Sequence, residues 1–437
     1  MLAKVIRTQS GRIFVYDGLT SRIISVKQKK ILRDEEIISK LIRRGLLSNQ
    51  RLGVVDWNVS RMDCEKFLSD KIPALVLQTT RSCNLRCDYC IYSGKYFHMR
   101  PHAPEHMPAE IMLRSVDFYA AHSCNTSMAE ISFYGGEPLL RFAEVTAAVD
   151  YAKKIFDKPL NFTMSTNGTL LDEKVSAWLA DNPNVKIIVT LNGTDHDKFR
   201  KDFFGRGTLE IIMARLQALK KNFPHVFEKQ VSFIANRHSF AEVAALRKFY
   251  VEQIGKLPER INRIRRDMGN AEIQKLFPVA DEHECDALSR LHKNFFDNPD
   301  EDFSRLLYGA RIEMIDTRKI FAPEDPMIVS CCRPFAVRLF VQTNGRFNVC
   351  ERTSDFFTLG DLEHGFDVDK IFSAMADVSE TINRNCRDCW AQRLCLLCFQ
   401  HLVDERGQIR KKIPESMCRD MRKNFLETLE LYCELYG

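Results

Sequence analysis

The sequence predicts an α/β protein built on a parallel β-sheet that closes, or partly closes, into a barrel. From residue 73 to about residue 254, short apolar runs rich in β-branched and aromatic residues alternate with amphipathic stretches of helical length. Glycine-containing turn signals follow several of these runs. Because parallel strands are joined by helical crossovers, this order indicates strand–loop–helix units with their loops gathered at one end of the sheet.

The composition is that of a globular protein with two or three domains. The 437 residues are 45% apolar and 28% charged, and 64 basic against 58 acidic residues give a net charge of +6. So small an excess, without a long segment of one sign, argues against a nucleic-acid partner. The sequence has no uncharged run of membrane-spanning length, and its start lacks the apolar core of a signal peptide. We therefore expect a cytoplasmic protein with no membrane partner.

Residues 1–72 are expected to form a separate N-terminal unit. Residues 12–19 and 23–26 predict a β-hairpin. Residues 34–47 predict an amphipathic helix with Asp34 as its N-cap. The exposed edge of a hairpin can accept an extended peptide as an added strand. A hairpin that only packs against the main domain agrees equally well with these residues.

The main domain is expected to begin at residue 73 and to end near residue 310. The expected strands are residues 74–80, 130–134, 160–166, 185–191 and 230–236, and the expected helices are residues 142–156, a stretch through Trp178, and residues 208–222 and 240–254. The four arginines between residues 260 and 266 could form a sixth strand or the solvated face of a helix, and we favour the solvated face. Residues 283–320 are expected to be helical and to bridge to the last domain.

Three closely spaced cysteines, Cys83, Cys87 and Cys90, follow the first expected strand of the main domain. Thiolates four and three positions apart on one loop can converge on a small metal centre, and three ligands leave one position for another group. Thiolates are the usual ligands of iron–sulfur clusters, so a cluster with a free iron site is favoured. A structural zinc site that lacks its fourth ligand and three unrelated thiols are the alternatives.

A second cysteine group lies near the C-terminus, around a hairpin with a strong Asn344-Gly345 turn signal. Its members are Cys331, Cys332, Cys350, Cys386, Cys389, Cys395, Cys398 and Cys418. Eight thiolates are enough for two sites of up to four ligands each, and two zinc sites are the structural alternative. The isolated cysteines are expected to be small core residues; they are Cys64, Cys124, Cys285 and Cys433.

The cysteine run, with Tyr89 before its last cysteine, resembles the cluster motif of radical S-adenosylmethionine (SAM) enzymes. The Gly-Gly-Glu-Pro run at residues 135–138 is similar to a motif of that family whose backbone meets the SAM amino group. The turn at residues 165–168 and the run from Asn192 to Arg200 also resemble family patterns, although many relatives have Asp at the position of Asn192. The resemblance implies a partial (β/α)6 TIM-like barrel over residues 73–310. It also implies SAM contacts from Tyr89, Gly135, Gly136, Glu137, Ser165 and Asn167.

The C-terminal cysteines resemble a SPASM domain, expected here within residues 311–437, which carries two auxiliary [4Fe–4S] clusters. By this resemblance Cys332, Cys350 and Cys398 hold the first cluster, with Cys331 as a candidate fourth ligand. The second cluster is held by Cys386, Cys389, Cys395 and Cys418. The chain departs from the family pattern in the two-residue gap before Cys398, where three residues are common. The adjacent Cys331–Cys332 pair also leaves the fourth ligand of the first cluster undecided, so that cluster could have an open site.

The first 72 residues look like the hairpin-and-helix prelude of enzymes that modify ribosomally made peptides. The resemblance therefore implies an oxidoreductase that reductively cleaves SAM to a 5′-deoxyadenosyl radical and oxidatively modifies a precursor peptide. The product would be a thioether, or a carbon–carbon or carbon–oxygen side-chain crosslink. Formation of formylglycine by a sulfatase-maturase-like enzyme and peptide epimerisation are alternatives within the superfamily. A zinc-binding scaffold without catalysis is the alternative from another class.

The implied cofactors are SAM and three [4Fe–4S] clusters, of which one binds SAM and two are auxiliary. The implied partners are the precursor peptide and an electron donor such as flavodoxin or ferredoxin. His98, Tyr134 and Arg200 are expected near the active face, but the sequence assigns no catalytic base among them.

Overall fold

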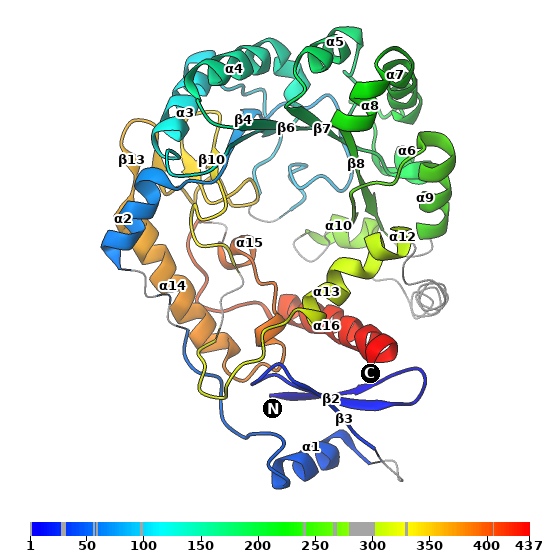
Figure 1. Cartoon of the computed structure of the whole chain (residues 1–437), viewed down its shortest axis with the longest axis vertical. Coiled ribbons are helices and arrows are strands. Elements are labelled where there is room, and N and C mark those ends of the chain that lie inside the picture. The colour runs from blue at the N-terminus through cyan, green and yellow to red at the C-terminus, as the bar shows by residue number, and fades with distance from the viewer. Residues whose placement is uncertain are drawn as a thin grey trace.

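The structure is a computed structural model that describes residues 2–27, 32–55, 57, 60–96, 99–238, 242–264, 269–278, 302–327, 331–404 and 406–437. Several sequence predictions lie outside these residues, namely those for His98, Arg265, Arg266, Cys285 and much of residues 283–320. Figure 1 shows a curved sheet with helices on its outer side, and two long helices and a small N-terminal sheet below it. Among the described residues, no helix has the length and apolar character needed to cross a membrane.

An eight-stranded sheet forms the centre of the main domain, in the order β11-β10-β4-β5-β6-β7-β8-β9. Six consecutive strands are parallel: β4 (Leu75–Thr80), β5 (Ala129–Gly135), β6 (Leu160–Thr166), β7 (Val185–Thr190), β8 (Val231–Arg237) and β9 (Arg260–Arg263). The predicted α/β fold with a parallel, partial barrel is therefore confirmed. The preference for a solvated helix face at the arginine cluster was wrong, because residues 260–263 pair with β8 as the sixth strand.

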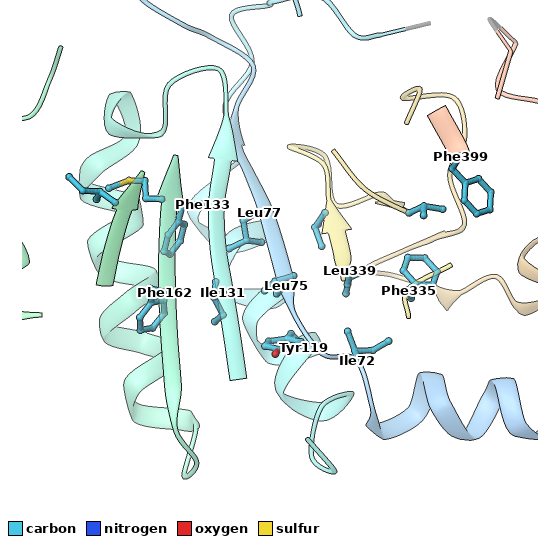
Figure 2. Packing of buried hydrophobic residues seen from close by; sticks show 14 of the residues in the cluster. Ile72, Leu75, Leu77, Tyr119, Ile131, Phe133, Phe162, Phe335, Leu339 and Phe399 are labelled. Atoms are coloured by element: carbon cyan, nitrogen blue, oxygen red, sulfur yellow. The ribbon is translucent and has the colours of Figure 1, made fainter. Parts of the chain in front are cut away.

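Helices cover the outer face of this sheet (Figure 1). They are α3 (Ala109–Ala121), α4 (Phe142–Ile155), α5 (Glu173–Asp181), α6 (His196–Phe199), α7 (Leu209–Asn222), α8 (Pro224–Gln230) and α9 (Val243–Phe249), which continues as a π-helical turn over Tyr250–Ile254. Figure 2 shows Leu77 beside Phe133, and Ile131 beside Phe162, on neighbouring strands, with Tyr119 of α3 below them. Burial of such side chains contributes about 1.5–3 kcal/mol each to stability.

The two faces of the parallel strands differ in exposure. Along β5, β6 and β8, fully buried side chains alternate with partly exposed ones. The buried side chains pack against the outer helices, so the partly exposed ones line the inner, barrel side of the sheet. Ser132, Tyr134, Thr163 and Ser165 belong to this inner set, and Ser132 and Thr163 are hydrogen-bonded at 2.6 Å. The interior of the barrel is therefore polar and reachable by solvent.

The C-terminal cysteine region is joined to the first barrel strand. β10 (Leu339–Val341) runs parallel to β4 and pairs with it, and β11 (Phe347–Asn348) returns antiparallel to β10. Gly345 has φ +85° in the turn between them, which confirms the predicted Asn-Gly hairpin. The remaining elements of this region are β12 (Gly360–Asp361), β13 (Gly365–Phe366), α14 (Val368–Cys386), α15 (Phe399–Leu402) and α16 (Glu415–Tyr436).

The N-terminal part is a three-stranded antiparallel sheet of β1 (Ala3–Arg7), β2 (Ile13–Asp17) and β3 (Ile23–Ser25). The predicted hairpin is present, and β1 was not predicted. Helix α1 (Asp34–Arg43) packs on one face of this sheet. Asp34 is the first helical residue rather than the N-cap, because the Glu36 side chain accepts a hydrogen bond from the backbone of Arg33 (2.9 Å), which holds the N-cap position.

The other face of the N-terminal sheet packs against α16. Phe14 and Tyr16 of β2 share a buried cluster with Phe425, Leu429 and Cys433. Both ends of the chain consequently lie close together (Figure 1). The connecting elements are α2 (Arg61–Asp70), α10 (Ala271–Leu276), α12 (Asp302–Ser304) with a π-helical turn over Arg305–Gly309, and α13 (Ala310–Asp316).

Candidate functional site

The three N-terminal cysteines lie on the loop that leaves the carboxyl end of β4. All three are partly buried free thiols. Burial raises the pKa of Cys83 and of Cys90 to about 12, and it also raises the pKa of Cys87. The thiolate charges of Cys87 and Cys83 further raise the pKa of Cys90. A cationic metal centre at this place would displace the protons that burial otherwise favours.

The two glycines of the Gly-Gly-Glu-Pro run lie backbone to backbone against this loop. Gly136 N donates to Thr80 O (2.8 Å), and Glu137 N donates to Ser82 O (2.9 Å). A Cβ added at Gly135 would lie 2.2 Å from Thr80 O, and one at Gly136 would lie 2.0 Å from Ser82 O. Gly135 also has φ +150°. Only glycine fits at these two positions, because any side chain would overlap the backbone of the cysteine loop.

Glu137 ties the β5 loop to the β6 loop. Its side chain is buried, and its carboxylate accepts hydrogen bonds from Leu139 N (3.1 Å), Thr166 Oγ1 (2.8 Å) and Asn167 N (2.7 Å). Burial raises the pKa of Glu137, and these hydrogen bonds oppose that rise. The Glu137 carboxylate is therefore occupied by hydrogen bonds within the protein.

Asn167 fastens the cysteine loop to the β6 loop. Its Nδ2 donates to Asn84 Oδ1 (2.8 Å) and lies 3.9 Å from Cys83 Sγ. Its Oδ1 accepts from Thr169 N (2.9 Å) and Thr169 Oγ1 (2.6 Å), and Asn84 Nδ2 donates to Thr169 Oγ1 (2.8 Å). Ser165, another predicted SAM contact, is on the inner face of β6 two residues before Asn167.

Tyr89 and Arg200 form a polar centre at the ends of β7 and β8. The Tyr89 hydroxyl accepts hydrogen bonds from Asn192 Nδ2 (2.8 Å), Arg200 Nη1 (3.0 Å) and Asn236 Nδ2 (3.4 Å). Burial opposes the charge of Arg200, but Tyr89 and the Cys87 thiolate raise the pKa of its guanidinium overall. Arg200 is thus a permanent positive charge beside the cysteine run. Its buried Nε has no hydrogen-bond partner among the described residues.

His196, within the family-like run, is held as a neutral side chain. It is fully buried, and burial followed by the charge of Arg200 lowers its pKa to about 3. Its Nδ1 accepts from Asn192 N (3.3 Å), and its Nε2 is 3.1 Å from Thr208 Oγ1. Its role is to brace the loop after β7. Tyr134 is on the inner face of β5, and burial raises the pKa of its hydroxyl.

The C-terminal cysteines fall into two adjacent groups. In the first group, burial and then the charge of the Cys398 thiolate raise the pKa of Cys331 and of Cys332. The Cys398 thiolate also contributes to the raised pKa of Cys350, of which burial is the main cause. Cys331 is buried, whereas Cys332 is exposed. The charge of Cys395, a member of the second group, also raises the pKa of Cys331.

In the second group, Cys389 is the shared neighbour. After burial, its thiolate charge raises the pKa of Cys386, Cys395 and Cys418. Within the described part of the chain, no three His, Cys, Asp or Glu side chains form a group that could hold a metal ion in the present side-chain arrangement. Of the isolated cysteines, Cys433 is buried as expected, but Cys124 is exposed in the turn after α3.

A buried bridge joins the N-terminal cysteine loop to the loop that follows Cys350. Tyr92 donates its hydroxyl hydrogen to Glu351 O (3.0 Å) and accepts from Arg100 Nη2 (2.8 Å). The Arg100 guanidinium lies 4.4 Å from the centre of the Tyr92 ring and 3.5 Å from Asp355 Oδ1. Sequence analysis missed this bridge, because no local pattern links residues about 255 positions apart.

The chain is similar to known proteins both in sequence and in fold. The model of the radical SAM superfamily matches residues 77–242. The cysteine-type anaerobic sulfatase-maturating enzyme of Clostridium novyi (strain NT) is 23% identical over 330 residues, which cover 71% of this chain and 80% of that protein. The serine-type anaerobic sulfatase-maturating enzyme of Bacteroides thetaiotaomicron is 29% identical over 145 residues, 32% of this chain and 34% of that protein.

Among solved structures, native anSMEcpe with bound AdoMet and Kp18Cys peptide superposes with a TM-score of 0.60. The two chains are 18% identical, and the superposition covers 83% of this chain and 97% of anSMEcpe. At this identity the likeness establishes a shared fold, including the α/β partial barrel described above.

Proposed function

Because residues 77–242 form a radical SAM domain and the chain is a maturase-type enzyme, we propose that it oxidatively modifies a ribosomally made precursor peptide. The product is a thioether, or a carbon–carbon or carbon–oxygen side-chain crosslink. The observation that carries this proposal is the N-terminal three-stranded sheet. Among the described strands, β3 pairs only with β2, so its other edge offers backbone groups to an extended peptide.

The peptide substrate is also supported by a protein of the same fold. anSMEcpe has been solved with both AdoMet and the Kp18Cys peptide bound. In the present chain the N-terminal unit, residues 1–72, would hold the precursor, and the inner face of the barrel would receive the residue to be modified.

The proposed cofactors, a [4Fe–4S] cluster and SAM, are assigned to residues at the mouth of the barrel. Cys83, Cys87 and Cys90 would hold one [4Fe–4S] cluster, and three partly buried thiols on one loop suit such a group. SAM would be contacted by Tyr89, Gly135, Gly136, Glu137, Ser165 and Asn167. When bound, these groups supply a 5′-deoxyadenosyl radical that can remove an unactivated hydrogen, which no side chain can do. Arg200 keeps a positive charge beside the thiolates, and Glu137 ties the glycine loop to the β6 loop.

Two auxiliary [4Fe–4S] clusters complete the proposal. Cys332, Cys350 and Cys398 would hold the first, with Cys331 as the candidate fourth ligand, and Cys386, Cys389, Cys395 and Cys418 would hold the second. This division is supported by the charges of two cysteines. The Cys398 thiolate raises the pKa of the other members of the first group, and the Cys389 thiolate raises the pKa of the other members of the second. The electron donor would be a flavodoxin or a ferredoxin.

A second candidate function is the oxidation of a Cys or Ser in a sulfatase to formylglycine. It is favoured by the sulfatase-maturating enzyme of Clostridium novyi, which the chain matches over 80% of that enzyme's length. The edge strand of the N-terminal sheet favours the precursor peptide instead, because a single target residue in a sulfatase needs no separate strand-binding unit.

The test is co-expression with candidate precursor peptides, followed by mass spectrometry. A crosslink gives a loss of two hydrogens, epimerisation gives no change of mass, and formylglycine formation from Cys removes its sulfur. The control is the Cys83→Ala/Cys87→Ala/Cys90→Ala variant, which should make no 5′-deoxyadenosine while it keeps the iron bound by the C-terminal cysteines. Production of 5′-deoxyadenosine by that variant, or zinc without labile sulfide in the wild type, would refute the proposal.

A further inference from the structure

An exposed aromatic turn lies beside the N-terminal cysteine loop. Phe203 is 68% exposed and Phe204 is 77% exposed, and their ring centres are 5.9 Å apart. They occupy the tip between Lys201 and Gly207, which pair with each other in an antiparallel bridge. Neighbouring apolar side chains with this exposure indicate an interaction surface when the backbone holds them in place.

The turn is held in place by Asp202. Asp202 Oδ1 accepts from Phe204 N (2.8 Å) and Arg206 N (2.9 Å), and Oδ2 accepts from Arg206 Nε (2.7 Å). These contacts, led by the backbone N–H of Arg206, keep the pKa of Asp202 below its usual range. Gly205 supplies the left-handed residue of the turn, with φ +79°. The two rings are thus displayed by a closed, hydrogen-bonded loop.

The turn is also bonded directly to the residues on either side of Cys87. Arg86 N donates to Lys201 O (2.7 Å), and Asp88 N donates to Phe199 O (2.8 Å). Leu85 forms a further antiparallel bridge with this segment. A protein bound to the turn would therefore sit against the loop that carries the cysteines. Electron tunnelling slows steeply with distance, so a redox partner needs this proximity.

The rim of the aromatic turn is basic. The Arg86 guanidinium lies 5.0 Å from the centre of the Phe203 ring, and that of Arg206 lies 5.2 Å from the centre of the Phe204 ring. Lys201 adds a third cation, whereas the carboxylate of Asp202 is engaged within the turn. An apolar centre with cations around it is complementary to a small acidic partner, and such charges accelerate encounter.

We propose that the turn around Phe203 and Phe204 is the docking surface for the electron donor, a small acidic protein with a flavin or iron–sulfur one-electron centre. This inference rests on the proposed radical SAM activity. The donor's reduced centre loses one electron, the iron–sulfur centre held by Cys83, Cys87 and Cys90 gains it, and no proton or covalent group moves. Small, weak and charge-steered contacts of this kind are typical of electron-transfer complexes.

The experiment uses the reconstituted holoenzyme and a Phe203→Ser/Phe204→Ser variant. Binding of oxidised flavodoxin, and in parallel of ferredoxin, is measured by calorimetry at low and high salt. Formation of 5′-deoxyadenosine is measured with the reduced carrier protein and, separately, with dithionite. Phe356→Ser is the matched control, because Phe356 is a 74% exposed phenylalanine elsewhere on the chain. Lys201→Glu tests the charge of the rim.

We expect the Kd for the carrier protein to rise at least tenfold in the double variant, with a similar fall in the carrier-driven rate below saturation. The dithionite-driven rate should equal that of the wild type, and Phe356→Ser should change neither value. Lys201→Glu should weaken binding at low salt and flatten its salt dependence.

Three outcomes would overturn the assignment of this turn as the docking surface. They are an unchanged Kd for the carrier, an equal loss of rate with dithionite, and a rise only in the KM for the peptide. The second would assign the turn to bracing the cysteine loop, and the third would assign it to the substrate. A wild type that dithionite activates but that binds neither carrier also overturns the inference. A wild type that forms no 5′-deoxyadenosine with dithionite refutes the proposed function itself.

Discussion

Replacing Gly136 by alanine tests whether the backbone contact between two loops positions the cysteine run. The added Cβ would lie 2.0 Å from Ser82 O, 2.4 Å from Ser82 C and 3.0 Å from Cys83 N, all of them backbone atoms. No side-chain rotation relieves such overlaps, so the two loops must separate. Overpacking costs about 1–3 kcal/mol, and each backbone hydrogen bond lost between the loops costs about 1 kcal/mol more.

We therefore expect Gly136→Ala to lower the free energy of unfolding by about 3 kcal/mol. A shift of about 1 Å near a reacting centre can cost about a hundredfold in rate, so SAM cleavage with dithionite should fall by at least that factor. Denaturant unfolding, iron content and 5′-deoxyadenosine are the measurements.

The control is Gly94→Ala, on the same stretch of chain. Its Cβ would meet nothing closer than Pro101 Cβ at 3.8 Å, and only the positive φ of +81° opposes it, which costs about 1–2 kcal/mol. This variant should keep SAM cleavage near the wild-type rate. If Gly136→Ala unfolds at the wild-type denaturant concentration and cleaves SAM at the wild-type rate, the contact between the two loops does not position the cysteines.

Three further predictions concern the rest of the chain. Arg100→Leu removes the hydrogen bond to the Tyr92 hydroxyl and the ion pair with Asp355, whose carboxylate keeps Arg81 Nη2 at 3.7 Å. The loss should cost about 2 kcal/mol in denaturant unfolding, less than a fully buried pair, because Asp355 is 22% exposed and keeps this second cation; an unchanged midpoint would contradict the bridge. Glu430 has its pKa raised to about 6 by burial and by a neighbouring glutamate, so the stability it contributes is present below pH 4.5 and is lost as pH rises through 6. Glu430→Gln should thus stabilise by about 1 kcal/mol at pH 7.5, after allowance for partial exposure, and by nothing at pH 4; equal effects at both pH values would refute this. Cys398→Ala and Cys389→Ala should each remove the iron of one C-terminal group, and a double variant that loses no more iron than either single variant would contradict the division.

The order of the barrel and its active edge could be predicted from the sequence. The alternation of buried runs and helices is a local property, and the carboxyl ends of parallel strands meet at one edge whatever the details of packing. The contacts of Glu137 and Asn167 join the cysteine loop, the glycine loop and the β6 loop at that edge, as the sequence order required. The sequence did not indicate that the Glu137 carboxylate would accept hydrogen bonds from the β6 loop and so join it to the glycine loop.

Other features could not be predicted because they depend on contacts between distant residues. The parallel pairing of Leu75 with Leu339 follows from the packing of two regions, and no turn signal announces it. The segment 260–263 suggested a solvated helix by its charge, but it is the last strand of the sheet. At such an edge, partly exposed positions tolerate arginine side chains whose stems lie on apolar surface.

Helix α16 links the N-terminal sheet to the second cysteine group. The distance between the sheet and this group is therefore set by the length of one helix. Cys418 lies in the first turn of the helix, and Cys433 packs near its end against the N-terminal sheet. Cys433 is fifteen positions after Cys418, which corresponds to about 22 Å along the helix axis at 1.5 Å per residue. A peptide added to the free edge of β3 would therefore be held at a fixed distance from the second group of cysteines. The pairing of β10 with β4 fixes the first group to the barrel in the same way, so the spacing between binding edge, cysteine groups and barrel mouth limits which residues of a peptide can reach the site.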